Sequence, residues 1–410
     1  MEYREVLRRL YSLANYERTK GFVKDIGRFR ALLRALGDPH ILLRAPLLVA
    51  GTKGKGSVVH MLARSLSNLG YRTGMNISPH LVSIHERIQI DGTPISEEDF
   101  AEVLGELFRV SDMGFPTTFF EAMTGAAILH FLRKGTDYQV FEVGLGGRLD
   151  ATNVVEQKVG VITRIDYDHT SILGETLEEI AAEKAGIIKG AAPIITPESN
   201  SRVLPVIERR ARRFGAPVVV VSHRVLSVGE EGTVFETDGR VVRLPVLGEF
   251  QAENGALAYH ALKSLGLEFD PTGVFVPGRM HILRRSPLLL VDGAHNPVSA
   301  KALVSSLRRI FPHRKFNFVL AFSRGKDYYG FIRTVADVAD WIFITRYPWR
   351  RSLEPEEVFR TCMLLHGRCG MLGGLHEILN RIHGDTVITG SLYLIGSFLR
   401  LFAYPNGLRT

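Results

Sequence analysis

The chain has 410 residues, of which 45% are hydrophobic and 23% charged, as expected of a globular protein long enough for two hydrophobic cores. No stretch is apolar over the length of a membrane span, and residues 1–17 carry charges of both signs without an apolar run. We therefore expect neither a membrane anchor nor a secretory signal. The formal net charge of +8 would suit a nucleic-acid partner, but the basic residues are spread along the chain, and the cluster at 208–213 lacks interleaved aromatic residues. We expect a solvated basic surface that attracts small polyanionic substrates, and neither a nucleic-acid nor a membrane partner.

The cysteine content is low, since Cys362 and Cys369 are the only two, with His366 between them. Three candidate ligands without a fourth make a weak zinc pattern. We predict two free thiols in a reducing compartment, and therefore a cytoplasmic protein.

The first predicted strand, 47–50, leads into a glycine-rich turn and then into a helix. The turn reads Gly51-Thr52-Lys53-Gly54-Lys55-Gly56-Ser57. Its glycines let backbone N–H groups converge on phosphate oxygens, and the helix that begins near Lys55 directs its positive end to the same point. We expect a bound nucleoside triphosphate, with Lys55 along the β and γ phosphates and the Ser57 hydroxyl on Mg²⁺. Because Gly56 separates the lysine from the hydroxyl, the string departs from GxxxxGK[ST]. The alternative is an ordinary glycine turn with two solvated lysines.

Strands and helices alternate over the next part of the chain, as in a mostly parallel α/β sheet. We predict a helix to residue 69, a strand at 72–77, a loop at 78–81, a strand at 82–91, helices at 96–110 and 117–133, strands at 138–143 and 159–164, and a helix at 176–189. An amphipathic segment at 3–36 precedes them.

The pattern predicts two domains. Further α/β units at 193–221 are followed at 224–247 by period-two strands with Gly and Asp turns, which predict a small antiparallel insertion. A helix at 251–257 closes the first domain, and a second α/β set contains strands at 288–292, 316–322, 341–345 and 385–389. We predict an α/β protein with domains 1–277 and 286–410, joined by a hinge at 278–285.

Chemically active side chains follow two of these strands. Glu142 ends one buried strand, and His169 follows another, while Lys184 lies in the middle of the next helix. Ligands gather at the carboxyl ends of parallel strands, and a triphosphate loop with an acid and a histidine suits metal-assisted phosphoryl transfer. Each residue has a structural alternative. Glu142 could be a buried acid paired with Arg148, and His169 could be bonded to a backbone carbonyl.

Several motifs occur in a fixed order along the chain: VAGTKGKGS, SPHL, TTFFE, FEVGLGGRLDATN, DHTSILGETLEEIAAEKAGIIK, PGR, DGAHNP and TGSLY. Together they resemble the folylpolyglutamate synthase and dihydrofolate synthase family of the Mur ligase superfamily. The resemblance covers essentially the whole chain, and EVGLGGRLDATN and EKAGIIK are its most specific parts. It implies a phosphate-loop domain of the Mur ligase central type, followed by a smaller Rossmann-like domain.

The resemblance implies ATP-dependent formation of an amide between a folate or dihydropteroate carboxylate and L-glutamate, through an acyl phosphate. Water would destroy that intermediate, so the two domains should close over it. The substrates are then small molecules, and a monomer is expected. Whether dihydrofolate synthase activity accompanies folylpolyglutamate synthase activity is left open.

The resemblance also implies roles for particular residues. Ser78 and Glu142 would lie near a first Mg²⁺ with Ser57, and Glu142, His169 and Lys184 would hold a second, with Lys184 carbamylated. The remaining implied contacts are Asn254, Arg279 and Asp292 with ATP, His295 and Ser391 with glutamate, and Thr118, Phe120 and Ala151 with the pterin-bearing substrate. Two departures stand out: Lys53 replaces the Asn of many members, where we expect mainly a backbone contribution, and Met280-His281 follow PGR.

Electrostatics alone argues that Lys184 would need modification to join a metal site. An ammonium about 4 Å from a divalent ion is repelled by several kcal/mol, even at an effective dielectric constant near 20. Carbamylation turns the amine into an anionic oxygen ligand, which suits a hard metal. The alternative is a solvated helix lysine.

Two other functions remain open. A Mur ligase that extends a nucleotide-linked muramyl peptide shares the phosphate loop and metal site, but the loop begins within about fifty residues of the first residue, less than a typical additional domain needs. A nucleic-acid-stimulated ATPase would fit the basic balance and would hydrolyse ATP without pteroate or glutamate.

Overall fold

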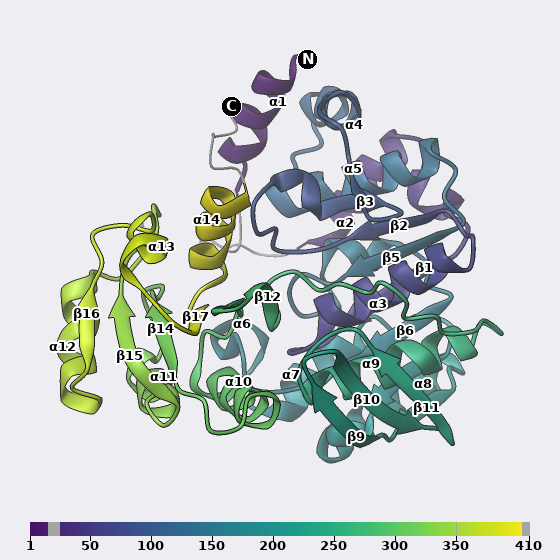
Figure 1. Ribbon diagram of the computed structural model, residues 1–410. Coiled ribbons are helices and arrows are strands. Elements are labelled where there is room, and N and C mark those ends of the chain that lie inside the picture. The colour runs from purple at the N-terminus through teal and green to yellow at the C-terminus, as the bar shows by residue number, and fades with distance from the viewer. Residues whose placement is uncertain (15–24, 350, 404–410) are drawn as a thin grey trace.

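The computed structural model describes residues 1–14, 25–349 and 351–403 (Figure 1). Its strands form three sheets. The eight-stranded sheet has the order β4-β3-β2-β5-β1-β6-β7-β8, with bounds Thr93–Pro94, Ile88–Ile90, Thr73–Asn76, Tyr138–Glu142, Pro46–Ala50, Val159–Ile162, Ile194–Pro197 and Val218–Val221. Pairing from β2 to β8 is parallel, while β3 pairs antiparallel with β2 and with β4.

The six-stranded sheet has the order β12-β13-β17-β14-β15-β16, with bounds His281–Arg285, Leu288–Val291, Thr386–Thr389, Phe316–Leu320, Ala339–Ile344 and Cys369–Met371. Only the β12–β13 pairing is antiparallel. The small sheet, β11-β10-β9, is antiparallel throughout, with bounds Arg240–Leu244, Gly232–Thr237 and Arg224–Gly229. The predicted α/β class with mostly parallel sheets is confirmed.

Helices cover both faces of the large sheet. They are α1 (Tyr3–Ser12), α2 (Ile26–Ala35), α3 (Lys55–Asn68), α4 (Glu97–Asp112), α5 (Phe119–Arg133), α6 (Thr170–Leu173), α7 (Leu177–Ala185), α8 (Leu204–Phe214) and α9 (Phe250–Lys263). Strand β1 shows why the sheet is buried twice: Leu48 and Ala50 face the core with α2, α4, α5, α7 and α8, while Leu47 and Val49 face α3 and α9. A strand that is buried on both faces reads as a continuous apolar run, as 47–50 does.

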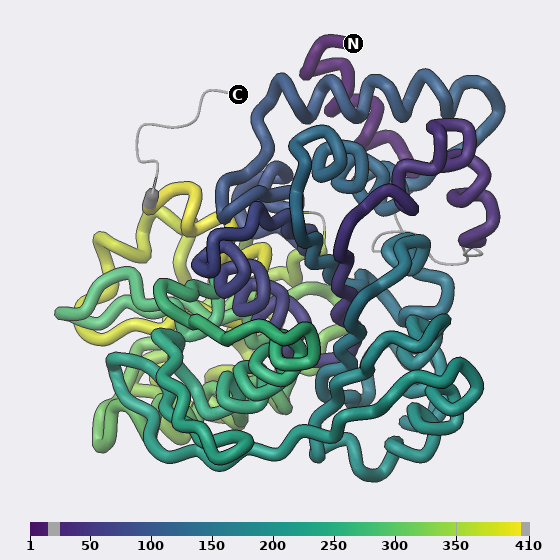
Figure 2. Tube along the Cα trace, turned by 90° about the vertical axis from the view of Figure 1, so that its right-hand side faces the viewer, coloured from purple at the N-terminus to yellow at the C-terminus, as the bar shows by residue number. Residues whose placement is uncertain are grey.

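The second sheet is covered in the same way by α10 (Pro297–Ile310), α11 (Tyr328–Val335), α12 (Pro355–Leu365), α13 (Glu377–Arg381) and α14 (Leu392–Ala403). Leu288 and Leu290 of β13 face the core with α10, α11 and α12, and Leu289 faces α13 and α14. In both views this C-terminal part, light green to yellow, gathers on one side of the molecule (Figures 1 and 2). The small sheet touches both cores, since Phe235 packs against Gly255 of α9 in the core that also contains α3, and Val228 packs in the core with α10.

The strand predicted at 82–91 is mostly wrong. Residues Ile84–Arg87 form a 3₁₀ helix, η2, and only β3 is extended. A capping box explains this: the Ser83 side chain accepts a backbone N–H, and the Glu86 carboxylate accepts those of Leu81, Val82 and Ser83 at 2.8–3.0 Å. The loop held by Glu86 reaches the second sheet, because the Leu81 carbonyl lies against Gly396 of α14, leaving no room for a side chain there.

Other boundaries also differ from the prediction. Helix α7 ends at Ala185 rather than at 189, because the backbone of Arg148 packs directly against Gly186. Strand β12 occupies part of the predicted hinge, and β16 was not predicted. Within the predicted amphipathic segment at 3–36 the structure has α1 and α2, and residues 15–24 lie outside the described residues. The remaining short 3₁₀ helices are η1 (Pro39–Leu42), η3 (Ala151–Val154) and η4 (Glu198–Val203).

The prediction of two free thiols is wrong. Cys362 in the last turn of α12 and Cys369 at the start of β16 form a disulfide, with Cα atoms 6.3 Å apart. The two elements pack side by side, which the sequence spacing did not reveal. The inference of a reducing compartment therefore loses this support. Separately, none of the helices in the described ranges is both long and apolar enough to cross a membrane.

Replacing Glu86 with Ala should lower the free energy of unfolding by about 2 kcal/mol, because three backbone N–H groups lose their common acceptor. Denaturant unfolding of Glu86→Ala measures the effect, with Glu98→Ala as the control because Glu98 is exposed on α4. Equal stability of the two variants would mean that the carboxylate does not organise the 78–83 loop.

The buried imidazole of His130 should make stability depend on pH. Burial on α5 lowers the pKa of His130 to about 4, with a small opposing effect of Asp99. Between pH 6.5 and 4 the unfolded chain therefore takes up a proton at this residue that the folded chain does not, so stability falls as the pH falls. Between pH 7 and pH 5, the free energy of unfolding of His130→Gln should fall by about 1–2 kcal/mol less than that of the wild type.

The measurement is denaturant unfolding at both pH values. His383→Gln is the control, because His383 is exposed. An identical pH dependence in wild type and His130→Gln would show that the His130 imidazole accepts a proton freely in the folded protein.

Candidate active site

Two sheet edges supply the predicted site residues. Strands β5, β1 and β6 are neighbours, and their carboxyl ends carry Glu142, the 51–57 loop and the segment that leads to His169. In the second sheet β13 and β17 are neighbours, and their carboxyl ends carry Asp292 and Ser391. Each group therefore lies where parallel sheets bind ligands.

The 51–57 loop has the backbone of an anion site. Gly54 has φ +89° and caps α3 at its N-terminus, and Gly51 has φ +146°. A Cβ on Gly54 would lie 2.1 Å from Asn254 Oδ1, and a Cβ on Gly51 would lie 1.8 Å from Thr163 Oγ1. Both positions thus need glycine, and the first turn of α3 presents N–H groups that have no intrahelical acceptor.

Two lysines converge on the end of β1. The Gly51 carbonyl accepts hydrogen bonds from Lys55 Nζ at 3.1 Å and from Lys184 Nζ at 2.8 Å. Lys184 is 4% exposed, so the alternative of a solvated helix lysine is wrong. A buried cation beside a glycine-rich turn favours a bound anion.

Glu142 is buried between the 51–57 loop and Ser78. Its Oε2 accepts the Ser78 N–H at 2.9 Å, and a Cβ on Gly56 would lie 3.6 Å from the same oxygen. Burial raises the pKa of Glu142, and Lys55, the Ser78 N–H and Arg279 oppose that rise. The alternative pairing with Arg148 does not occur, because Arg148 binds Glu183 at 2.8 Å.

His169 lies at the rim of the site. It has φ +50°, precedes α6, and keeps 56% of its side chain exposed. Its Nε2 lies 3.8 Å from Asp168 Oδ1, and within the described ranges its ring forms no hydrogen bond to a carbonyl, so that alternative is not seen. Burial lowers the pKa of His169, and Asp168 opposes the change.

Lys53 contributes more than its backbone. Its N–H donates to the Arg164 carbonyl at 3.2 Å, as expected for a loop residue, but its Nζ also lies 4.0 Å from Asp168 Oδ2. Burial lowers the pKa of Lys53, while Asp168 raises it. The prediction that Lys53 acts mainly through its backbone is therefore incomplete.

Asp292 follows β13 of the second sheet, and Arg279 lies in the segment just before β12. Asp292 accepts the N–H groups of Met280 at 2.8 Å and Ala294 at 2.9 Å. The Arg279 guanidinium occupies the space that a Cβ on Gly293 would need, 1.9 Å away. Burial raises the pKa of Asp292, and Arg279 opposes that rise. Because Arg279 also lowers the pKa of Glu142, it lies within electrostatic range of both sheets' carboxylates.

His295 and Ser391 are brought together by the Ala294 carbonyl, which accepts the Gly390 N–H at 2.9 Å. His295 Nδ1 lies 3.0 Å from the Gly293 carbonyl, which can only accept, so Nδ1 carries the proton and Nε2 keeps a lone pair. Burial lowers the pKa of His295 to about 4, and Lys326 and Lys53 add to the effect. The imidazole is therefore neutral at pH 7.

Three residues were predicted to lie beside the pterin-bearing substrate. Phe120 packs its ring on Gly144, where a Cβ would lie 2.5 Å away, and Ala151 is 5% exposed. The Thr118 hydroxyl caps α5 and donates to Glu121 at 2.8 Å, so its side chain has a structural role. Phe120 and Ala151 therefore lie at the 144–153 loop.

Lys326 was not predicted as a site residue. It follows β14 of the second sheet, yet its charge acts on the pKa values of Lys53, Asp168, His169 and His295. The signal that could have found it is its place after the carboxyl end of a parallel strand. Asp168 was likewise not predicted as a site residue.

The donor set suits a hard cation only in part. Ser57 is buried near Glu142, and hydroxyl and carboxylate oxygens are the ligands that Mg²⁺ prefers. Among the described residues no three His, Cys, Asp or Glu side chains cluster closely enough to hold a metal ion. A metal here would therefore need further oxygens from a phosphate or from a modified lysine.

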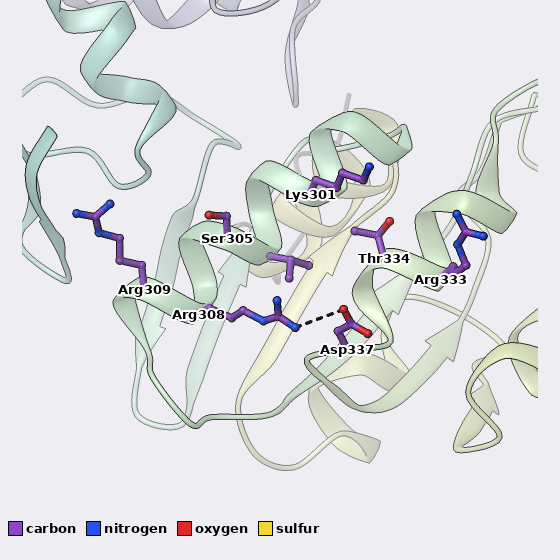
Figure 3. Close-up of a pocket in the computed structure, with 8 residues that line it drawn as sticks. Lys301, Ser305, Arg308, Arg309, Arg333, Thr334 and Asp337 are labelled. Carbon is purple, nitrogen blue, oxygen red and sulfur yellow. Dashed lines mark hydrogen bonds and ion pairs between the residues drawn. The ribbon is translucent and has the colours of Figure 1, made fainter. Parts of the chain in front are cut away.

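A pocket of about 730 Å³ between α10 and α11 lies apart from this site (Figure 3). It is lined by Lys301, Val304, Ser305, Arg308, Arg309, Arg333, Thr334 and Asp337. Arg308 pairs with Asp337 at 3.3 Å, and Arg309 pairs with Glu249. None of the predicted site residues lines it, so the strand ends remain the candidate site.

The chain was compared with known proteins. The model of the Mur ligase middle domain matches residues 49–262, and that of the dihydrofolate synthetase C-terminal domain matches 281–401. The dihydrofolate synthase/folylpolyglutamate synthase of Bacillus subtilis is 33% identical over 367 residues, 83% of this chain and 85% of the relative.

Solved structures agree. The folylpolyglutamate synthase of Thermotoga maritima matches with a TM-score of 0.89 at 31% identity, covering 98% of this chain and 97% of that one. A bifunctional folylpolyglutamate synthase/dihydrofolate synthase from Yersinia pestis, complexed with AMPPNP and a Mn ion, matches with a TM-score of 0.83 at 25% identity, covering 98% of each chain. The chain belongs to the folylpolyglutamate synthase and dihydrofolate synthase family of Mur ligases.

Proposed function

We propose that this protein is an ATP-dependent ligase that joins L-glutamate to the carboxylate of a folate or a dihydropteroate. The observation that carries the proposal is the meeting of two strand-end clusters. One has a phosphate loop with Lys55 and the buried Glu142, and the other has Asp292 with a neutral His295. Arg279 acts on carboxylates of both. Family membership supplies the reaction class.

The first step makes the carboxylate reactive. A carboxylate is a poor acyl donor, so its oxygen attacks the γ-phosphorus of ATP, ADP leaves, and an acyl phosphate forms. The loop N–H groups and Lys55 stabilise charge on the transferring phosphoryl group. Asn254, Arg279 and Asp292 are the proposed contacts with the rest of ATP. Asn254 borders the loop at Gly54, and Asp292 accepts the N–H of Met280, the residue after Arg279.

The second step forms the amide. The glutamate amine attacks the acyl carbon, phosphate leaves, and the amine loses a proton. His295 is suited to receive a hydrogen bond from that amine, because Nε2 keeps a lone pair while Nδ1 binds the Gly293 carbonyl. Ser391 lies beside His295, and its hydroxyl oxygen accepts a hydrogen bond from the Tyr393 N–H at 3.2 Å.

The proposed metal ligands are Ser57, Ser78, Glu142, His169 and Lys184, for two Mg²⁺ ions. Such ions would neutralise charge on the phosphates of ATP. The Mn ion and AMPPNP in the Yersinia pestis relative support a nucleotide with a divalent metal. The backbone N–H of Ser78 donates to Glu142 at 2.9 Å, which supports Ser78 as a neighbour of that proposed ligand.

Carbamylation of Lys184 is compatible with its contacts. A carbamate keeps one N–H on Nζ, so the 2.8 Å bond to the Gly51 carbonyl could persist, and the new carboxylate would supply oxygen ligands for a metal. The modification also removes a buried cation that would repel Mg²⁺. We therefore keep the carbamate as a proposal.

We also propose the broader organisation of the enzyme. The matches at 49–262 and 281–401 support two domains. Strand β12 begins at His281 and pairs with β13, so only residues 278–280 of the proposed hinge at 278–285 precede the second sheet. We place the enzyme in the cytoplasm as a monomer that uses small-molecule substrates, without nucleic acid. One protein of this family can carry folylpolyglutamate synthase activity, dihydrofolate synthase activity or both.

The test is ADP release measured with dihydropteroate, with tetrahydrofolate and with a muramyl precursor, each with and without L-glutamate. We expect turnover only when a pteroate or folate and glutamate are both present, and loss by orders of magnitude in Lys55→Ala. Glutamate-dependent turnover of the muramyl precursor would favour a peptidoglycan ligase. Release stimulated by DNA without glutamate would favour an ATPase.

Lys184→Ala should lose most activity, and acetate or formate should restore part of it by filling the vacated space with a carboxylate. Bicarbonate-depleted wild type should lose activity reversibly. A fully active Lys184→Ala enzyme would show that this residue is not a metal ligand.

A further inference from the structure

The side chain of Asn153 ties the loop after β5 to the turn after α7. Asn153 is 4% exposed, and its Nδ2 donates to the carbonyls of Arg148 and Gly186, each at 3.1 Å. Its Oδ1 accepts Lys189 Nζ at 2.8 Å, and Lys189 also donates to its main-chain carbonyl. Every hydrogen-bonding group of the Asn153 amide is therefore used between these two segments.

The two segments also meet backbone to backbone. A Cβ on Gly147 would lie 2.8 Å from the carbonyl oxygens of Glu183 and Lys184, and the Arg148 N–H donates to the Glu183 carbonyl at 2.8 Å. No side chain separates them at this point. A shift of the loop therefore moves the backbone that carries Lys184.

Lys189 closes this junction and is not one of the proposed site residues. It is half-buried, and its Nζ binds the two oxygens of Asn153. Burial lowers the pKa of Lys189 to about 7; Arg30 adds to the change and Glu156 opposes it. Burying the Lys189 ammonium has an electrostatic cost. Contact with solvent therefore does not explain its position in a junction that contains the EKAGIIK motif.

We propose that Asn153 and Lys189 are positioning residues, which hold the 144–153 loop against residues 183–189. Glu142 ends the strand that leads into the loop, Ala151 lies near the end of the loop, and the helix bears Lys184. The junction thus keeps the pteroyl end of the site in register with the phosphoryl-transfer end. This inference rests on the proposed function for its kinetic consequence, but the junction itself does not.

The kinetic test uses Lys189→Met, which keeps length and loses both donated bonds. Lys158→Met is the control, because Lys158 is an exposed lysine on the same domain. We expect kcat/KM for dihydropteroate to fall about 10- to 100-fold, with the KM for ATP unchanged, because small misplacements of reacting groups have effects of this size. Lys189→Arg, which can still donate to Asn153, should recover much of the loss.

A general loss of folded protein would instead lower kcat and leave both KM values unchanged. A folded Lys189→Arg variant distinguishes this loss from a positioning effect. Hydrogen exchange followed by mass spectrometry adds a measurement that needs no activity. Peptides that cover 144–153 should exchange faster in Lys189→Met than in Lys158→Met, while peptides of α3 should not change.

The outcomes are distinguishable. Unchanged exchange at 144–153 in a folded Lys189→Met protein would overturn the positioning role, whatever the enzyme turns over. Faster exchange with a wild-type kcat/KM for dihydropteroate would show that the junction is structural only, which also overturns the proposal. If the wild type failed to turn over any pteroate, the proposed function would fall, and the exchange result would still decide the role of the junction.

Discussion

The Gly51 carbonyl, which accepts both Lys55 and Lys184, is the contact around which the site is arranged. Bringing two ammonium groups to one carbonyl is costly, because they repel each other and the carbonyl carries only a partial charge. Glu142, on which the charge of Lys55 acts, is itself buried, and burial raises its pKa. The end of β1 therefore holds positive charge that a bound phosphate would balance, and this demand explains why neighbouring elements converge there.

The rigidity of that point comes from β1 being buried on both faces. Its alternate side chains enter two different cores, so the strand cannot shift without disturbing helices on either side of the sheet. The Glu86 loop and α14 connect this sheet to the second one, where Leu81 meets Gly396. The geometry at the strand ends is thus fixed by packing remote from the chemistry.

The sequence predicted those helices and strands that a local pattern of residues determines. The β1–α3 unit was clear because an apolar run, three glycines and a helical face follow one another in a single stretch. The 82–91 segment was misassigned because alternating residues outweighed a capping box, and the disulfide depends on α12 lying beside β16, which spacing does not encode. In the site, Lys326 and the junction at Asn153 were missed because their partners are distant in sequence.

The charges facing the site bear on its closure. Lys53 and Lys55 come from one sheet, and Arg279 and Lys326 come from the hinge and the second sheet. Lys53 lowers the pKa of His295, Arg279 lowers that of Glu142, and Lys326 lowers that of His169, each across the site, while Lys55 acts on Glu142 of its own sheet. Without anions these cations repel one another through a poorly screened space. A triphosphate offsets that repulsion, so nucleotide binding and the approach of the two sheets favour each other. Water exclusion, which an acyl phosphate requires, would then be strongest when the polyanion is present.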